Sequence, residues 1–136
     1  MITVTATPAA GTQPSDVPDL RQLRATVLRS VLALTEAHAP SMPCDIGMSD
    51  HTSRGGYRFL VLHMDRNAAH DFHRWAAVLG LTAREPSDFD LDTARRWRAL
   101  RAGRHDPDGP FTGWGLVEVS CYIDLPPYAQ DRDGDA

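Results

Sequence analysis

Residues 114–125, WGLVEVSCYIDL, decide the fold because they form the clearest β-strand pattern in the chain. The stretch is rich in β-branched and aromatic side chains, and its apolar residues alternate as a strand requires. One predicted face consists of Val117, Val119, Cys121 and Ile123. The opposite face consists of Trp114, Leu116, Glu118, Ser120 and Tyr122. Both faces therefore carry apolar side chains, whereas an antiparallel sheet usually presents a polar face to water.

A second strand is predicted for residues 57–64, with the same two-sided pattern. Its first face consists of Leu60, Leu62 and Met64. Its second face consists of Tyr57, Phe59, Val61 and His63. Before it, Cys44, Ile46 and Met48 alternate with Asp45 and Gly47, and the intervening Arg54-Gly55-Gly56 indicates a turn. The two segments together predict a β-hairpin.

Two helices are predicted from apolar residues at helical spacing. The first covers residues 16–39, because Asp16 is a suitable N-cap and Pro40 ends the helix. Its apolar face consists of Leu20, Leu23, Val27, Val31 and Leu34. The second runs from Asn67, a preferred N-cap residue, to Gly80, which suits the left-handed position after a helix. Its apolar face consists of Phe72, Trp75, Ala76 and Leu79.

The remaining segments are less regular. Residues 82–93 contain Pro86 and four acids, and we predict a loop. Residues 94–102 fit a helix or a strand, and we favour a strand because a hairpin with residues 114–125 needs only local pairing. The order α-β-β-α-β-β indicates an α+β two-layer sandwich, with two helices on one face of a four-stranded antiparallel sheet. Residues 1–17 and the acidic residues 126–136 are predicted to be flexible tails on one domain, residues 18–125.

The composition narrows the class of protein. The chain has 136 residues, enough for one domain, and its formal net charge of −4 excludes a globally basic nucleic-acid binder. All 14 basic residues are arginine, a bias typical of a GC-rich bacterial genome. Cys44 and Cys121 are too few for a disulfide framework. Because no signal peptide or membrane-spanning run is visible, we expect a cytoplasmic protein with reduced thiols and no membrane contact.

The second face of the sheet is the most informative feature. Two helices can cover only one side of a small sheet, so the other side is expected to present a candidate binding face. This face would consist of Tyr57, Phe59, His63, Trp114 and Tyr122, with Arg96 and Arg98 nearby. The chain's own tails or loops, a second copy, or a ligand would cover it. Aromatic rings beside arginine on an open sheet also suit single-stranded nucleic acid, which the negative net charge disfavours.

A cluster of histidines in the sequence suggests an alternative hypothesis, in which the protein is an enzyme rather than an interaction protein. His63, His70 and His73 lie close together in the sequence, with Asp65 and Asp71 between them. Histidine and carboxylate side chains bind zinc-like metals, so a metal-dependent enzyme is one alternative. The spacing matches none of the established metal motifs, and no nucleophile motif is present.

The leading hypothesis is therefore a non-catalytic interaction protein without a cofactor. We expect it to act through the aromatic sheet face, as a homodimer or with another protein as partner. Single-stranded nucleic-acid binding through the same face, and a metal enzyme built on the three histidines, remain the alternatives.

Overall fold

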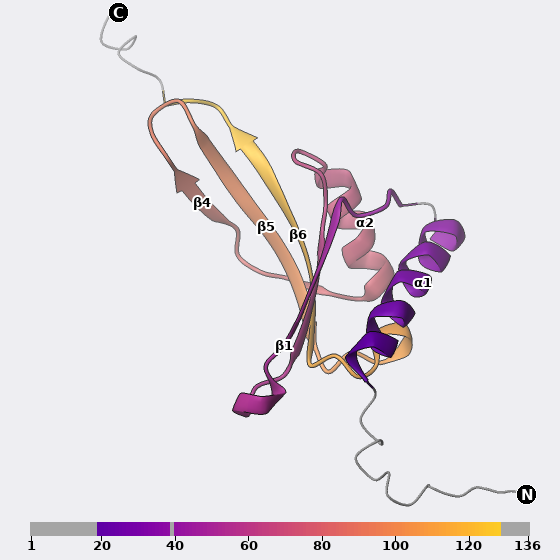
Figure 1. The fold of residues 1–136 in the computed structure, drawn as a ribbon. Helices are drawn as coiled ribbons and strands as arrows, with labels where there is room; N and C mark the ends of the chain where they lie inside the picture. The colour runs from indigo at the N-terminus through magenta and orange to yellow at the C-terminus, as the bar shows by residue number, and fades with distance from the viewer. Residues whose placement is uncertain (1–18, 39, 129–136) are drawn as a thin grey trace, which may run out of the picture.

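Two helices and six strands make up the α+β fold of the described residues, 19–38 and 40–128, in the computed structural model (Figure 1). The helices are α1 (Leu20–His38) and α2 (Ala69–Leu79), with short 3-10 helices η3 (Thr52–Arg54) and η4 (Gly109–Phe111). The strands are β1 (Asp45–Asp50), β2 (Arg58–His63), β3 (Thr82–Ala83), β4 (Ser87–Asp90), β5 (Arg96–His105) and β6 (Leu116–Leu125). None of the helices in this part of the chain has the length and apolar character that a membrane span needs.

The strands form one mixed sheet in the order β1-β2-β6-β5-β3, and β4 also pairs with β5. Both predicted hairpins are present, because β1 pairs antiparallel with β2 and β5 pairs antiparallel with β6. The prediction of a four-stranded, wholly antiparallel sheet is wrong, since β2 and β6 are parallel, with Leu60 opposite Val117 and His63 opposite Ser120. The physical reason is the crossover through α2, which returns the chain so that β6 can run beside β2 in the same direction.

The hydrophobic core lies between the sheet and the two helices, which pack on the same face, as predicted. The helices contribute Leu23, Val27 and Val31 from α1, and Phe72 and Trp75 from α2. The sheet contributes Leu60, Leu62, Ala102, Val117, Val119 and Cys121. Fully burying one Val, Leu or Phe side chain stabilises a fold by about 1.5–3 kcal/mol. This layer therefore supplies most of the favourable free energy of folding.

The start of α2 differs from the prediction at Asn67. The helix begins at Ala69, and Ala68 occupies the N-cap position without a side-chain capping hydrogen bond. Asn67 has a left-handed backbone, with φ of 66°, and its Nδ2 donates to Asp124 Oδ2 over 2.9 Å. The N–H of Asp124 donates to Asn67 Oδ1 over 2.7 Å. Asn67 therefore ties the loop before α2 to β6 and does not cap the helix.

The two other predicted helix boundaries have different outcomes. Gly80 ends α2 in the left-handed conformation, with φ of 64°, as its position in the sequence predicts. Asp16, the predicted cap of α1, lies outside the described residues, as do most of the predicted tails.

Three strands project beyond the helices as an arm, which we define as β4, residues 96–99 of β5 and residues 122–125 of β6 (Figure 1). The prediction of a loop over residues 82–93 is wrong here, because β3 and β4 both form in this segment and pair with β5. The preference for a strand over a helix in residues 94–102 is confirmed by β5.

Candidate functional site

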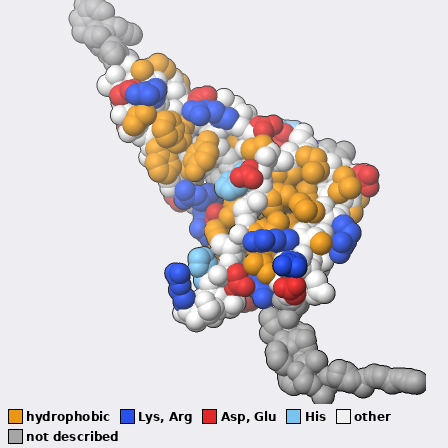
Figure 2. Space-filling model, viewed as in Figure 1, with side chains coloured by type: hydrophobic (Ala, Val, Ile, Leu, Met, Phe, Trp, Pro, Cys, Tyr) orange, Lys and Arg blue, Asp and Glu red, His pale blue; other side chains and the backbone are white. Residues whose placement is uncertain are grey.

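One face of the arm carries three aromatic side chains, Phe89, Trp97 and Tyr122, which we call the arm face. Phe89 lies opposite Trp97 across the β4–β5 pair, and their rings are stacked with centroids 6.4 Å apart. Tyr122 comes from β6, opposite Ala99. Phe89 is 39% exposed and Tyr122 is 43% exposed. Figure 2 shows hydrophobic side chains gathered on the arm. The exposed fractions of Phe89 and Tyr122 show that aromatic rings contribute to this surface.

The Trp97 ring is held in place from the loop before α2. The Arg66 guanidinium carbon lies 5.7 Å from the centre of the Trp97 ring, a favourable cation–π distance. Arg66 Nε donates to Asp124 Oδ1 over 2.7 Å, so the guanidinium is itself fixed. Hydrogen bonds from Arg66 and Asn67 lower the pKa of the Asp124 carboxyl, which is ionised at neutral pH. The contacts with Arg66 and with the stacked Phe89 ring therefore restrict the Trp97 side chain before any partner binds.

The reverse face of the arm is charged and internally neutralised. Arg98 Nε donates to Asp88 Oδ1 over 2.7 Å, and Arg96 Nε donates to Asp90 Oδ1 over 3.2 Å. The hydrogen bond from Arg98 lowers the pKa of the Asp88 carboxyl. Tyr128 closes this face, since its hydroxyl donates to Asp90 over 2.6 Å and its ring lies 3.8 Å from the guanidinium carbon of Arg96. Arginine and aspartate charges thus cancel on this side.

The structure divides the seven residues of the predicted binding face into three groups. Those on the side of the sheet away from the helices are Tyr57, Phe59, His63 and Tyr122. Trp114 is only 2% exposed and belongs to the hydrophobic core, which corrects its predicted exposure. Arg96 and Arg98 lie on the reverse face, because alternate residues of a strand point to opposite sides and Trp97 occupies the arm face.

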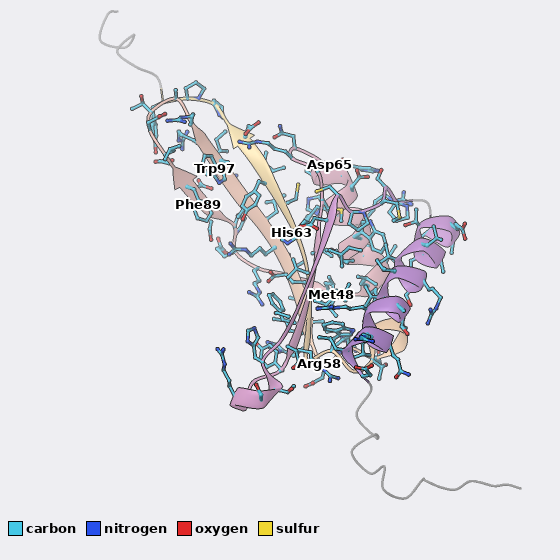
Figure 3. The ribbon with its side chains drawn as sticks, in the orientation of Figure 1. Met48, Arg58, His63, Asp65, Phe89 and Trp97 are labelled. Atoms are coloured by element: carbon cyan, nitrogen blue, oxygen red, sulfur yellow. The ribbon has the colours of Figure 1, made fainter. Side chains whose placement is uncertain are left out.

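The predicted face is also not one continuous aromatic patch. Tyr57 lies near the start of β6 and contacts the His105 ring edge-on, with ring centroids 5.9 Å apart. Tyr122 lies near the other end of the same strand. Between them, His63 Nδ1 is 2.8 Å from Ser120 Oγ, and Figure 3 shows His63 at the middle of the sheet. A polar band therefore separates the arm face from Tyr57.

The polar band also contains a buried carboxylate that is paired with an exposed arginine. Glu118 is 7% exposed, and its Oε2 lies 3.2 Å from Arg84 NH1. Arg84 therefore supplies the buried Glu118 carboxylate with a compensating positive charge.

The predicted metal cluster is not assembled. His63 lies on the face of the sheet away from the helices, whereas His70 and His73 lie on α2, which packs against the other face. The sheet itself therefore separates His63 from the other two histidines. Among the described residues, no three side chains of His, Cys, Asp or Glu are close enough to hold a metal ion, and Asp65 and Asp71 do not complete such a site.

The two cysteines are free thiols rather than a disulfide. Desolvation raises the pKa of the Cys44 thiol, and the nearby Asp65 carboxylate raises it further. Burial also raises the pKa of Cys121. Because the thiolate is the nucleophilic form, both cysteines are weak nucleophiles at neutral pH.

Two residues of the arm face, Phe89 and Trp97, are absent from the predicted binding face. Phe89 was hidden by the loop prediction for residues 82–93, although Ser87-Asp88-Phe89-Asp90 alternates as an edge strand does. Trp97 fits the strand pattern, but only the register with β6 shows which face it occupies. The alternation of acids with Phe89, opposite an arginine-rich strand, was the available signal.

Comparison with known proteins assigns no relative to this chain. No family model, no curated protein and no solved structure gives a significant match. The fold and the site together define the class as an α+β domain with an ordered, exposed aromatic arm. The function must therefore be inferred from the geometry of the arm.

Proposed function

We propose that the protein is a non-catalytic, cytoplasmic interaction protein that associates with a second copy of itself through the arm face. The observation that carries this proposal is the exposure of Phe89 and Tyr122 beside the fixed ring of Trp97. Removing apolar surface from water stabilises an association by roughly 25 cal/mol per Å². Contiguous apolar surface on a soluble protein usually marks an interaction site.

The residue types of the arm face are those that dominate protein–protein binding energies. Tryptophan and tyrosine are enriched among the few residues whose truncation weakens an interface strongly. Arg66 lies over Trp97, and arginine is a third residue type enriched at such positions. Pre-ordering of these side chains lowers the entropic cost of binding.

The charges around the arm face favour a second copy over a strongly charged partner. A two-fold contact places the same surface against itself, so a rim of one sign would repel its partner. Here Arg66 and Asp124 lie side by side, with Arg66 NH2 2.6 Å from Asp124 Oδ1, and the rim carries both signs. Each copy can therefore oppose its arginine to the other copy's aspartate.

The face of the arm is a better docking surface than its edge. The edge strand β4 carries Asp88 and Asp90, which would lie near their own counterparts if two β4 strands paired. Charged residues on an edge strand disfavour such pairing. Face-to-face docking leaves the ion pairs of these aspartates with Arg98 and Arg96 intact.

The nucleic-acid alternative has less support. Base stacking on the arm face would need cations beside the rings to hold phosphates. The cation beside the rings, Arg66, is already paired with Asp124. Arg96 and Arg98 lie on the reverse face and are also paired with aspartates. The charge balance therefore favours a protein partner.

Sedimentation velocity over a range of protein concentrations tests the proposal. We expect the wild type to form dimers as concentration rises, and the double variant Phe89→Ser/Tyr122→Ser to remain monomeric. The matched control is Leu28→Ser/Leu32→Ser, which removes two leucines of α1 that are 55% and 52% exposed. This control should dimerise like the wild type.

Circular dichroism establishes that both double variants are folded. A wild type that stays monomeric at every concentration would overturn the proposal. Loss of dimers in the leucine variant, with dimers retained in the arm variant, would move the interface to α1.

A further inference from the structure

A cleft of about 620 Å³ lies at the opposite end of β6 from the arm. It is bordered by the start of β2, by η3 and by the loop between β5 and β6. Its size falls in the range of about 300–1,000 Å³ that is usual for small-molecule sites. The residues that define its chemistry are Tyr57, Arg58, Asp106 and Trp114. Figure 3 shows Arg58 at this end of the sheet, far from Phe89 and Trp97.

Arg58 is a buried cation with only part of its guanidinium satisfied. The residue is 9% exposed, and its Nε donates to Asp50 Oδ2 over 3.1 Å. Asp50 is fixed in turn by the backbone N–H and the hydroxyl of Thr52, and these hydrogen bonds and Arg58 lower its pKa to about 2. Among the described residues, no acceptor binds the two terminal nitrogens of Arg58. Buried arginines normally use these donors, so the free edge of the guanidinium points to a missing acceptor.

Trp114 is a second buried donor beside the same cleft. It is 2% exposed, and its indole N–H has no acceptor in the part of the chain that the structure describes. Trp75, which is equally buried, donates its indole N–H to the carbonyl of Ser41 over 2.7 Å. Because buried tryptophan N–H groups usually find a partner, Trp114 is a second unsatisfied donor among the residues that line the cleft.

Asp106 places an unpaired carboxylate at the rim of the cleft. No arginine or histidine among the described residues forms an ion pair with it, although its neighbours Arg104 and Asp108 pair with each other. Its backbone is left-handed, with φ of 47°, a conformation that aspartate and asparagine adopt more readily than most residues other than glycine.

Tyr57 forms the aromatic wall of the cleft, and close packing against its neighbours holds its ring in position. Tyr57 lies against Gly115, where an added Cβ would be only 2.4 Å from Tyr57 Cβ. Only glycine at this position lets the tyrosine approach so closely. The edge-on contact with His105 holds the ring from the other side.

We propose that this cleft binds a small zwitterionic amino acid with an apolar side chain. Its carboxylate accepts hydrogen bonds from the terminal nitrogens of Arg58 and from the indole N–H of Trp114. Its ammonium group pairs with Asp106, and its side chain packs against Tyr57. A multiply charged phosphate fits less well, because Asp50 already balances Arg58 and Asp106 adds a second negative charge.

Titration with L-phenylalanine, followed by the three tryptophan indole N–H signals in a ¹H–¹⁵N spectrum, tests the proposal. We expect the Trp114 signal to shift, whereas Trp75 in the core and Trp97 on the arm serve as internal controls and stay in place. 3-Phenylpropanoate, which lacks the ammonium group, and phenethylamine, which lacks the carboxylate, should each bind roughly tenfold or more weakly.

The variant Asp106→Asn isolates the ammonium contact, because asparagine tolerates the left-handed backbone. This variant should bind L-phenylalanine about as weakly as the wild type binds 3-phenylpropanoate, because both complexes lack the pair between the ammonium group and Asp106. The control Asp108→Asn, an 84% exposed aspartate of the same loop, should bind like the wild type.

Three results would overturn the assignment. One is a Trp114 signal that does not respond to L-phenylalanine. Another is equal affinity for L-phenylalanine and 3-phenylpropanoate. The third is stronger binding of inorganic phosphate than of L-phenylalanine. None of these results bears on association through the arm, which is tested separately by sedimentation.

Discussion

The two halves of β5 are stabilised by different physical effects. In the half under the helices, Ala102 is fully buried and Leu100 packs against the core. In the arm half, Arg96 and Arg98 lie in solvent-accessible ion pairs, and Trp97 makes the principal ring contact. Burial stabilises the first half, whereas in the second half Ala99 alone is buried and local pairing orders the other residues. Substitutions in the arm can therefore change binding while lowering the free energy of unfolding of the whole domain only slightly.

The largest expected effect comes from replacing one tryptophan in each region. Trp75 is fully buried and hydrogen-bonded, so Trp75→Ala should lower the free energy of unfolding by about 3–5 kcal/mol. Trp97 is only partly buried, so Trp97→Ala should cost much less, about 1 kcal/mol. Urea unfolding followed by far-UV circular dichroism at low protein concentration measures both.

The low concentration keeps association from adding to the stability of the wild type. Equal losses for the two variants would show that the arm is an integral part of the core. That outcome would remove the distinction between the two halves of β5.

The same contrast explains how much of the fold the sequence could predict. Helix and strand positions around the core follow from apolar periodicity, because Val27, Phe72 and Val119 must all face one layer. The parallel pairing of β2 with β6 could not be predicted. It places His63 opposite Ser120, two residues far apart in the sequence, and the local pattern of apolar residues does not specify which strands become neighbours. Local periodicity therefore locates the helices and strands but does not determine the order of the strands in the sheet.

The arm was harder to predict than the core, and the reason is again physical. Ser87–Asp90 is short, acidic and preceded by a proline, which is the composition of a loop. Its strand conformation depends on arginines of β5 that lie opposite Asp88 and Asp90. The aromatic character of the open face was predictable from Tyr122, but Phe89 required the pairing to be known.

A smaller, local effect is expected from breaking one ion pair of the arm. Arg98 holds Asp88 through two hydrogen bonds, of 2.7 Å and 3.2 Å. Because exposed pairs contribute little to global stability, Arg98→Gln should leave the urea midpoint nearly unchanged. It should instead accelerate amide hydrogen exchange in β4, while the amide of Val119 in the core exchanges as in the wild type.

A matched control is Arg95→Gln, because Arg95 pairs with Asp92 in the loop before β5 and not across strands. This variant should leave exchange in β4 unchanged. If Arg98→Gln accelerates amide exchange at Val119 as much as in β4, the arm and the core open together. The hypothesis that the arm opens independently of the core would then be wrong.

The smallest expected effect is the titration of Asp88 itself. Its hydrogen bond with Arg98 holds its pKa below the ordinary value of 3.8. A carboxyl whose folded pKa is depressed contributes stability above its unfolded pKa, and that contribution is lost as pH falls through the folded value. Carboxyl ¹³C shifts should therefore give a lower titration midpoint for Asp88 in the wild type than in Arg98→Gln.

Salt distinguishes this arm contact from a contact near the cleft. Asp50 has a pKa of about 2, and the first cause is hydrogen bonding to Thr52 rather than to a cation. Screening by about 1 M salt weakens interactions between exposed charges, so the midpoint of Asp88 should rise while that of Asp50 changes less. If the titration midpoint of Asp88 does not change with salt, the attraction between Asp88 and Arg98 is not what holds β4 against β5. The arm would then share the rigidity of the core, and the difference between the two halves of β5 would be one of exposure alone.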